Sequence, residues 1–368
     1  MSNVRAHARQ TLFHVVQRDA LPPVKAAAFR LMAVLAALLT GGLFLLALGL
    51  DPLAVYGTMI SGSLGSESNI RETVKIAIPL CITALGILLA FKMKFWNIGA
   101  EGQICVGAIA ASYFAYHHNT WPPVILLLVM AAAGILLGGL WGMIPAWFKT
   151  RYGTNETLFT LMMNYVALYI IQYLREGPWK DPKSMGFPQM ARYAASARMP
   201  TVLGVHIGWI VAIVLVVLVL LYLRYTKQGY ELTVVGENEN TARYAGMAVK
   251  RIVLRTMFLS AAICGLAGVL KVSGADRVLT ESVAGGVGFT AITVAWLARL
   301  SPVGIMLVSI LFGIMEKGCG TIQSVFKVST SVAQVLQGII LFFVLGAEFF
   351  LTYRLIKRKS SIRKGVEA

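Results

Sequence analysis

The chain has 368 residues, of which 57% are apolar and only 13% are charged, and its mean hydropathy is +0.72. This composition excludes a soluble domain of this size, because soluble domains carry about 25% charged residues. The formal net charge of +17 does not indicate binding of a nucleic-acid polymer, since the 33 Lys and Arg residues are spread through short segments between apolar runs. We therefore expect an all-α, polytopic integral membrane protein surrounded by membrane lipid.

About ten apolar runs are long enough, at about 20 residues, to cross a hydrocarbon core as helices. They lie near residues 31–50, 74–91, 98–116, 123–147, 156–174, 205–223, 252–271, 283–299, 302–320 and 332–353. They define a transmembrane domain over 31–353, between an N-terminal tail (1–30) and a basic C-terminal tail (354–368). With the N-terminus inside the cell, 22 of the 33 Lys and Arg residues face the cytoplasm. This bias predicts that both termini are cytoplasmic.

Polar residues interrupt the apolar pattern in the segment 97–103, where a carboxylate and two amides stand among glycines. A charge at membrane depth costs about 2.5 to 3.5 kcal/mol, so it normally faces protein or water. The next helix is expected to start near Ile98, with Glu101 in its first turn, where the helix dipole favours an anion. Two uses are open. Asn97, Glu101 and Gln103 line a substrate pathway, or the segment is a structural joint whose polar groups satisfy one another.

Other membrane runs contain further candidates for the pathway. Asn164 and its neighbour Tyr165 lie deep in the run 156–174. The alternative for Asn164 is a hydrogen bond between helices, which is worth about 0.6 kcal/mol in membranes. Trp141 and Phe289 could stack on a base or a sugar, although aromatic residues in membrane helices more often pack against neighbouring helices.

Glycines indicate close helix packing and an internal repeat. Gly134, Gly138 and Gly142 recur at every fourth position, which lets another helix approach closely. Whether that helix belongs to this chain is open. A glycine-rich segment at 285–288 precedes a span much as the segment 97–99 does, which favours a repeat.

Two segments outside the membrane are long enough to bind partners. The external segment, 175–205, contains four prolines that divide it into turns, with one short helix expected over 189–198. The cytoplasmic segment, 225–255, is expected to hold a short helix over 239–245, which Gly246 ends.

The run Phe91 to Gln103 resembles a signature of the permease subunits of bacterial ABC importers of the nucleoside and simple-sugar class, within the ribose and branched-chain amino-acid permease superfamily. Further similar motifs follow in the same order, at 153–156, 161–165, 177–182, 229–246, Ser260 and 265–268. The resemblance runs from about residue 51 to residue 353. Departures stand at Thr157-Leu158, where a branched pair is usual, at Thr241, where alanine is common, and at Ser260-Ala261, where Ser-Gly is usual.

The resemblance implies a multi-pass subunit in the bacterial inner membrane. Two permeases, identical or different, would enclose the pathway for a nucleoside or a related simple sugar. A binding protein or lipoprotein outside would deliver the solute, and a cytoplasmic ABC ATPase would bind ATP and Mg. This chain itself would hold no cofactor and no metal. It would not be an enzyme, and the sequence contains no GxxxxGK[ST], HExxH or GxSxG motif.

The resemblance places coupling to the ATPase in the cytoplasmic segment. The residues concerned are Gly236, Glu237, Asn238, Ala242, Arg243, Tyr244 and Gly246. Tyr244 and Arg243 are best placed to enter a groove on the ATPase, and the alternative is a solvated loop helix.

Five basic residues of the external segment would steer the acidic rim of a binding protein. They are Arg175, Lys180, Lys183, Arg192 and Arg198. The alternative is a solvated loop whose charges bind nothing specific.

A different class of transporter is the second candidate function. An ion-coupled secondary transporter of a small polar solute would share the apolar spans and broken helices, but it would need no coupling segment.

Overall fold

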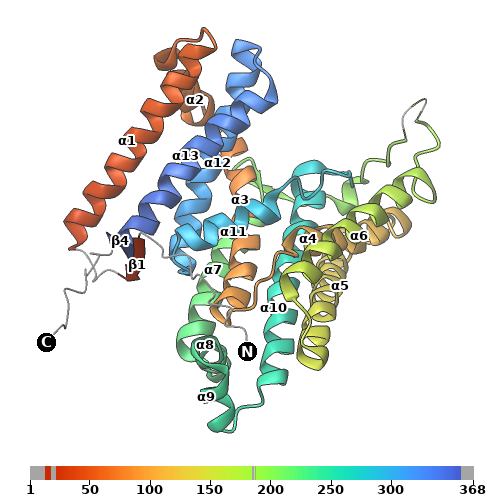
Figure 1. The fold of residues 1–368 in the computed structure, drawn as a ribbon. Coiled ribbons are helices and arrows are strands. Elements are labelled where there is room, and N and C mark those ends of the chain that lie inside the picture. Colours follow the sequence, from red (N-terminus) through yellow and green to blue (C-terminus); the bar gives the residue numbers. More distant parts are fainter. Residues whose placement is uncertain (1–12, 18–21, 185, 187, 358–368) are drawn as a thin grey trace, which may run out of the picture. The chain divides into compact units, whose positions relative to one another are not determined.

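The computed structural model describes residues 13–17, 22–184, 186 and 188–357, and this part of the chain is mostly helical (Figure 1). The helices are α1 (Pro23–Ala47), α2 (Pro52–Leu64), α3 (Glu67–Lys92), α4 (Ala100–His117), α5 (Pro123–Tyr152), α6 (Glu156–Glu176), α7 (Gly208–Tyr225), α8 (Lys227–Glu237), α9 (Glu239–Tyr244), α10 (Val249–Leu270), α11 (Val287–Leu297), α12 (Pro302–Phe326) and α13 (Thr330–Thr352). A π-helix, Lys271–Asp276, continues α10. Two short antiparallel pairs join β1 (Phe13–Gln17) to β4 (Tyr353–Lys357) and β2 (Thr201–Val202) to β3 (Val205–His206).

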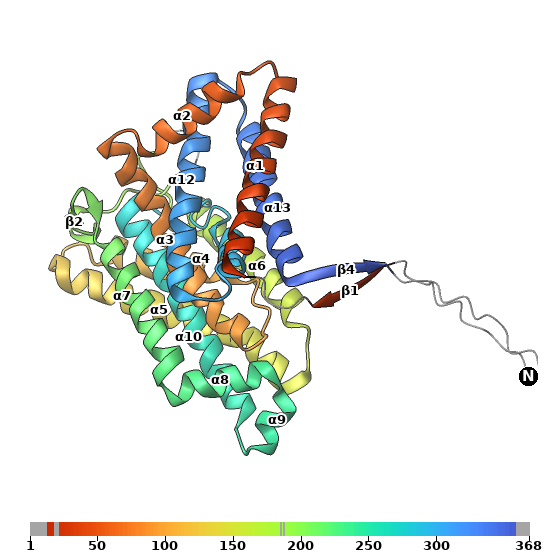
Figure 2. The ribbon, with the colours of Figure 1, turned by 90° about the vertical axis from the view of Figure 1, so that its left-hand side faces the viewer.

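The chain divides into two compact units, Met59–Thr321 and a terminal unit made of Met1–Thr58 and Ile322–Ala368. In the terminal unit, α1 packs against α13, and β1 pairs with β4 (Figure 2). Arg30 Nε donates to Oε1 of Glu348 at 2.6 Å, which links these two helices. Residues 1–12 and 358–368, which belong to the predicted tails, lie outside the described residues.

Eight helices of the described part are long and apolar enough to cross a membrane. They are α1, α3, α5, α6, α7, α10 with its π-helix, α12 and α13. The prediction of an all-α polytopic membrane protein is therefore confirmed. The two remaining predicted spans coincide with α4 and α11. Since α11 has only 11 residues, it extends about 16 Å, which is too short to cross the bilayer alone.

Both α4 and α11 start inside the larger unit, after a linker that turns inward. Residues 93–99 lead from the end of α3 to Ala100, and Asn97 within this linker is fully buried. The segment 277–286 leads from the π-helix to α11, and Val283 and Ala284 in it are buried. Gly285 and Gly286 have φ values of +57° and +83°, which explains why the helix starts at Val287 and not at residue 283.

The three glycines of α5 pack against α10, so the approaching helix belongs to this chain. A Cβ atom at Gly138 would lie 2.8 Å from Cα of Gly265, and one at Gly142 would also contact α10. Close contact of two backbones explains the spacing of small residues. Most of α3 and α10 is buried, whereas α5, α6 and α7 expose apolar side chains, as helices that face lipid do.

The external segment does not form the helix predicted over 189–198, and only a 3₁₀ turn, Ala195–Ala197, is present. Its backbone binds distant residues instead. Tyr193 N donates to the carbonyl of Arg277 at 2.9 Å, and Met199 N donates to that of Ser273 at 3.0 Å. The Tyr193 side chain is 1% exposed, and its hydroxyl lies 2.5 Å from Ser112 Oγ on α4. The prediction was wrong because these contacts satisfy groups that a helix would otherwise pair internally.

Candidate transport and coupling sites

The two amide side chains of the segment 97–103 bind each other. Asn97 Nδ2 donates to Oε1 of Gln103 at 3.3 Å, and Gln103 Nε2 donates to Oδ1 of Asn97 at 3.2 Å. The same Asn97 oxygen accepts from the backbone N–H of Gly99 at 3.0 Å. Both side chains are buried, and their hydrogen bonds hold the linker between α3 and α4 in its inward course.

Asn164 joins this linker to α6. Its Oδ1 accepts from the N–H of Gly102 at 2.8 Å, and its Nδ2 donates to the carbonyl of Ile98 at 2.9 Å. One turn earlier on α6, Thr160 Oγ1 accepts from the N–H of Ile98 at 3.2 Å. Because α4 starts here, these bonds satisfy backbone groups that the helix itself leaves unpaired. Asn155, by contrast, caps the start of α6 by accepting from Leu158 N.

Glu101 joins the starts of α4 and α11. Its Oε1 accepts from the N–H of Gly286 and its Oε2 from the N–H of Gly288, both at 2.7 Å. Glu101 itself lies in the first turn of α4. Since the free N–H groups give a helix start a partial positive charge, one carboxylate stabilises two helix starts at once.

These contacts support the structural-joint interpretation of Asn97, Glu101, Gln103 and Asn164, while contact with a substrate remains a prediction. Glu101 also binds the glycine-rich segment 285–288. The structure thus brings together the two helix starts that the sequence predicts to be repeats of each other.

The other three pathway candidates form no hydrogen bond with this network in the part of the chain that the structure describes. Tyr165 on α6 and Phe289 on α11 are both exposed. Trp141 on α5 is half-buried, and its Nε1 has no partner among the described residues.

An aromatic cluster that the sequence analysis did not single out lies beside this joint. The rings of Trp96 and Trp296 stack at 5.8 Å, and Phe91 lies 5.5 Å from the first ring and 5.7 Å from the second. Trp96 directly precedes Asn97, and Trp296 lies near the end of α11, so the cluster holds α11 against α3. Both tryptophans are about half exposed.

The coupling candidates lie on α8 and α9 and at the two ends of α9, at the end of the larger unit where α7 ends and α10 begins (Figures 1 and 2). The helix expected over 239–245 forms as α9, with Asn238 Oδ1 accepting from the N–H groups of Asn240 and Thr241. Gly246 ends it with a φ of +77°. Ala242 is buried, whereas Tyr244 on the same helix is 93% exposed.

The α8 and α9 pair is fixed to the membrane helices. A Cβ atom at Gly236 would collide with the carbonyl of Lys92, so α8 packs directly on the end of α3. Lys94 Nζ donates to the carbonyl of Glu237 at 3.2 Å, and Arg255 on α10 pairs with Glu231 on α8 at 3.0 Å. On α9, Arg243 pairs with Glu239 at 2.5 Å. These contacts hold α8 against both α3 and α10, and α9 follows α8 after a single residue.

The predicted docking residues do not share one environment. Arg175 is paired with Glu176 at 3.1 Å and with Glu281 at 2.9 Å, and Arg198 Nε donates to the carbonyl of Tyr193. The remaining three, Lys180, Lys183 and Arg192, are exposed. A cavity of about 470 Å³ lies between the external segment and residues 278–282, with Arg175 and Arg192 in its wall.

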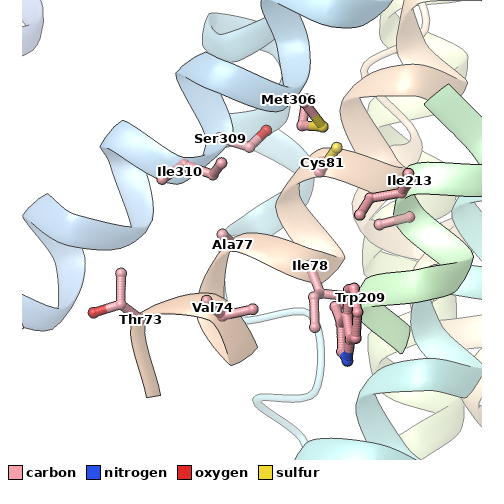
Figure 3. A pocket seen from close by; sticks show the side chains of 11 residues that line it. Thr73, Val74, Ala77, Ile78, Cys81, Trp209, Ile213, Met306, Ser309 and Ile310 are labelled. Carbon is pink, nitrogen blue, oxygen red and sulfur yellow. The ribbon is translucent and has the colours of Figure 1, made fainter. Parts of the chain in front are cut away.

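An apolar pocket of about 160 Å³ lies between α3, α7 and α12 (Figure 3). Its only hydroxyl-bearing side chains are those of Thr73 and Ser309, and the rest of its wall is apolar apart from the edge of Trp209. A polar solute would lose its hydrogen bonds to water there without replacement, so this pocket does not suit a sugar or nucleoside.

Comparison with known proteins places the chain in a family. The profile of the family described as "Branched-chain amino acid transport system / permease component" matches residues 69–345. The chain is 33% identical to the glucose ABC transporter permease protein TsgB13 of Haloferax volcanii, over 88% of each chain. It is 30% identical to the guanosine ABC transporter permease protein NupP of Bacillus subtilis, over 85% of this chain and 91% of that relative. The nucleoside ABC transporter permease protein NupB of Lactococcus lactis is 28% identical, over 90% of this chain and 93% of that relative.

The family assignment confirms the resemblance to ABC permeases and decides against an ion-coupled secondary transporter. It also implies an ATPase and a substrate-binding partner, and it agrees with a multi-pass protein of the inner membrane in bacteria. The chain is thus a transport component without catalytic activity of its own. It belongs to the family of permease components of branched-chain amino acid transport systems and is the membrane permease subunit of an ABC importer.

Proposed function

We propose that this permease imports a nucleoside or a related simple sugar, and that α9 transmits the motion of a cytoplasmic ATPase to the pathway. The observation that carries the proposal is the exposure of Tyr244 on a short, capped helix in the largest cytoplasmic segment. A fully exposed aromatic ring on a fixed helix is typical of a residue that anchors a partner protein.

The contacts of α8 and α9 support this role. Ala242 buries one face of α9 against the protein, so Tyr244 and Arg243 are presented on a helix that cannot rotate freely. Below them, Gly236 and Glu237 contact the end of α3 and the linker that leads to Asn97. The linker residues that contact Gly236 and Glu237 therefore lie only a few residues before the joint at 97–103.

The rest of the transporter follows from this role. ATP and Mg would bind the partner ATPase and not this chain. A second permease, identical or different, would complete the pathway. A binding protein or lipoprotein would dock on the external segment, where Lys180, Lys183 and Arg192 are exposed.

The names of the relatives support the substrate class. Two of the three relatives described above are named for guanosine or nucleosides, and the third is named for glucose. These solutes share several hydroxyl groups and carry no net charge.

Uptake by the reconstituted transporter tests the proposal. Proteoliposomes would contain the permease with its ATPase and second permease, and the purified binding protein would be added outside. We expect ATP inside the vesicles to drive uptake of radiolabelled guanosine or radiolabelled glucose, with no response to a sodium or proton gradient. Gradient-driven uptake without ATP, or ATP-driven uptake of neither solute, would contradict the proposal.

A further inference from the structure

Two of the charged residues inside membrane spans of the larger unit, Lys271 and Glu316, belong to neither the joint nor the coupling segment, and a second lysine, Lys317, directly follows Glu316. Lys271 is the first residue of the π-helix, within the membrane span Val249–Asp276. Glu316 lies near the middle of α12, within the span Pro302–Phe326. Both are visible in the sequence as charges within the apolar runs 252–271 and 302–320.

Neither charge is neutralised by a close contact. In the part of the chain that the structure describes, neither side chain forms an ion pair or a hydrogen bond, although the Lys271 ammonium interacts electrostatically with Glu101, Asp276 and Glu316. Glu316 is exposed, and Lys271 is half-buried. An exposed charge at membrane depth is costly in contact with lipid, so these side chains must face water or a polar partner.

The surroundings of Lys271 place it beside the start of α11. Its Nζ would be 3.6 Å from a Cβ atom at Gly285, the residue that leads into the turn bound by Glu101. Phe289 follows in the first turn of α11, and its side chain is exposed. A donor on the π-helix and an aromatic residue of α11 thus lie at the start of a broken helix, which is where membrane transporters bind their solutes. The Glu316 carboxylate on α12 interacts electrostatically with the same ammonium.

The position of Lys271 also connects it to the external segment. The π-helix that begins with Lys271 is held by Met199, whose N–H binds the carbonyl of Ser273 at 3.0 Å. The next residue after the π-helix, Arg277, binds Tyr193 in the same way.

We infer that Lys271 and Glu316 line the aqueous pathway and bind the passing solute, with Lys271 as hydrogen-bond donor and Glu316 as acceptor. This inference rests on the proposed function and deepens it. The ligand that fits is a neutral solute with several hydroxyl or amide groups, which can accept from the ammonium and donate to the carboxylate. Since three carboxylates, those of Glu101, Asp276 and Glu316, interact electrostatically with the Lys271 ammonium, we expect a phosphorylated or carboxylate-bearing solute to bind less well than a neutral one.

Uptake kinetics of the full transporter test the inference. The variants are Lys271→Met and Glu316→Gln, which remove charge at nearly constant size, and the matched controls are Lys25→Met and Glu67→Gln, at exposed positions near the starts of α1 and α3. With radiolabelled guanosine as the probe, we expect the KM of each pathway variant to rise about tenfold or more. The controls should stay within about twofold of the unaltered protein. Unchanged KM values in both pathway variants would overturn the inference.

Accessibility of the two positions gives a readout that does not depend on transport. Cys81, Cys105, Cys264 and Cys319 are buried and would be replaced by Ala. A membrane-impermeant thiol reagent should then modify Lys271→Cys and Glu316→Cys, and guanosine delivered by the binding protein should slow the modification. Absence of modification in well-folded protein, with and without ATP, would contradict a water-filled pathway at these residues.

The two proposals fail differently. If the unaltered transporter takes up neither guanosine nor glucose, the proposed substrate class is wrong, while thiol modification still shows whether Lys271 and Glu316 face water. If it takes up guanosine and the variants behave like the controls, only the assignment of Lys271 and Glu316 is wrong.

Discussion

The carboxylate of Glu101 accepts a hydrogen bond from the backbone N–H of Gly286, which lies 185 residues further along the chain. This contact, with its counterpart at Gly288, ties the start of α4 to the start of α11. Neither helix follows directly from the helix before it, so both starts have free N–H groups inside the protein. A carboxylate in this position is therefore a structural requirement before any role in transport.

Glu101→Gln tests this requirement. The amide keeps the size of the side chain but loses the charge, and its NH₂ group would face an N–H donor of α11. Charge-assisted bonds to buried groups are worth about 1.5 to 3 kcal/mol each, so we expect a lower thermal unfolding temperature for the purified permease. Glu67→Gln, at the exposed start of α3, is the matched control and should unfold as the unaltered protein does. Equal unfolding temperatures for all three proteins would show that the contact is dispensable.

Asn164→Ala separates the two interpretations of the joint. The substitution removes the partners of Gly102 N and the Ile98 carbonyl, which costs about 1 to 3 kcal/mol if both groups stay buried. If Asn164 acts only as a joint, Asn164→Ala should lower the unfolding temperature while the KM of the folded fraction stays constant. A raised KM with normal stability would instead identify Asn164 as a pathway residue. Tyr169→Phe, an exposed change on the same helix, serves as the control.

The external segment should respond to charge reversal. Arg192→Glu replaces an exposed cation, and if Arg192 steers an acidic binding protein, stimulation of ATP hydrolysis by that protein should fall about fivefold at low salt. The difference should shrink as salt is raised, because exposed charges are screened. Arg151→Glu, an exposed change beside the end of α5, should have no effect on this stimulation. A loss that does not depend on salt would argue for misfolding of the segment and against steering.

His206 should make stability depend on pH. Burial, with a smaller effect from Lys75, lowers the pKa of His206 from 6.5 to about 4. Its Nδ1 accepts from Gly208 N at 3.3 Å, and protonation would remove that acceptor. The unfolded chain takes up a proton on His206 below pH 6.5, whereas the folded protein does so only near pH 4. The contribution of neutral His206 to the free energy of unfolding is therefore complete above pH 6.5 and is lost as the pH falls towards 4. As the pH is lowered from 7 to 4, the melting temperature should fall less steeply for His206→Gln than for the unaltered protein. Equal slopes would contradict the assignment of this pH dependence to His206.

The sequence predicts the membrane architecture well because lipid imposes long apolar helices, and each expected span coincides with a helix. The short helix α9 was also predictable, since Asn238 and Gly246 are strong local signals for its two ends. The partners of Asn164 and Glu101 were not predictable, because they lie 62 to 187 residues away. The missing helix at 189–198 has the same cause, since Tyr193 and Met199 bind residues of a distant helix.

The measurement that tests the central claim most directly is coupled transport by Tyr244→Ala. The ring is 93% exposed, so its removal should leave folding and abundance unchanged. Loss of an anchoring aromatic residue costs about 2 kcal/mol or more, which corresponds to about a thirtyfold weaker hold on the ATPase. In proteoliposomes we expect ATP-driven uptake of guanosine to be largely lost, while Tyr173→Ala, an equally bulky exposed change on α6, transports normally. Normal uptake and normal stimulation of ATP hydrolysis in Tyr244→Ala would contradict the role of α9 in coupling.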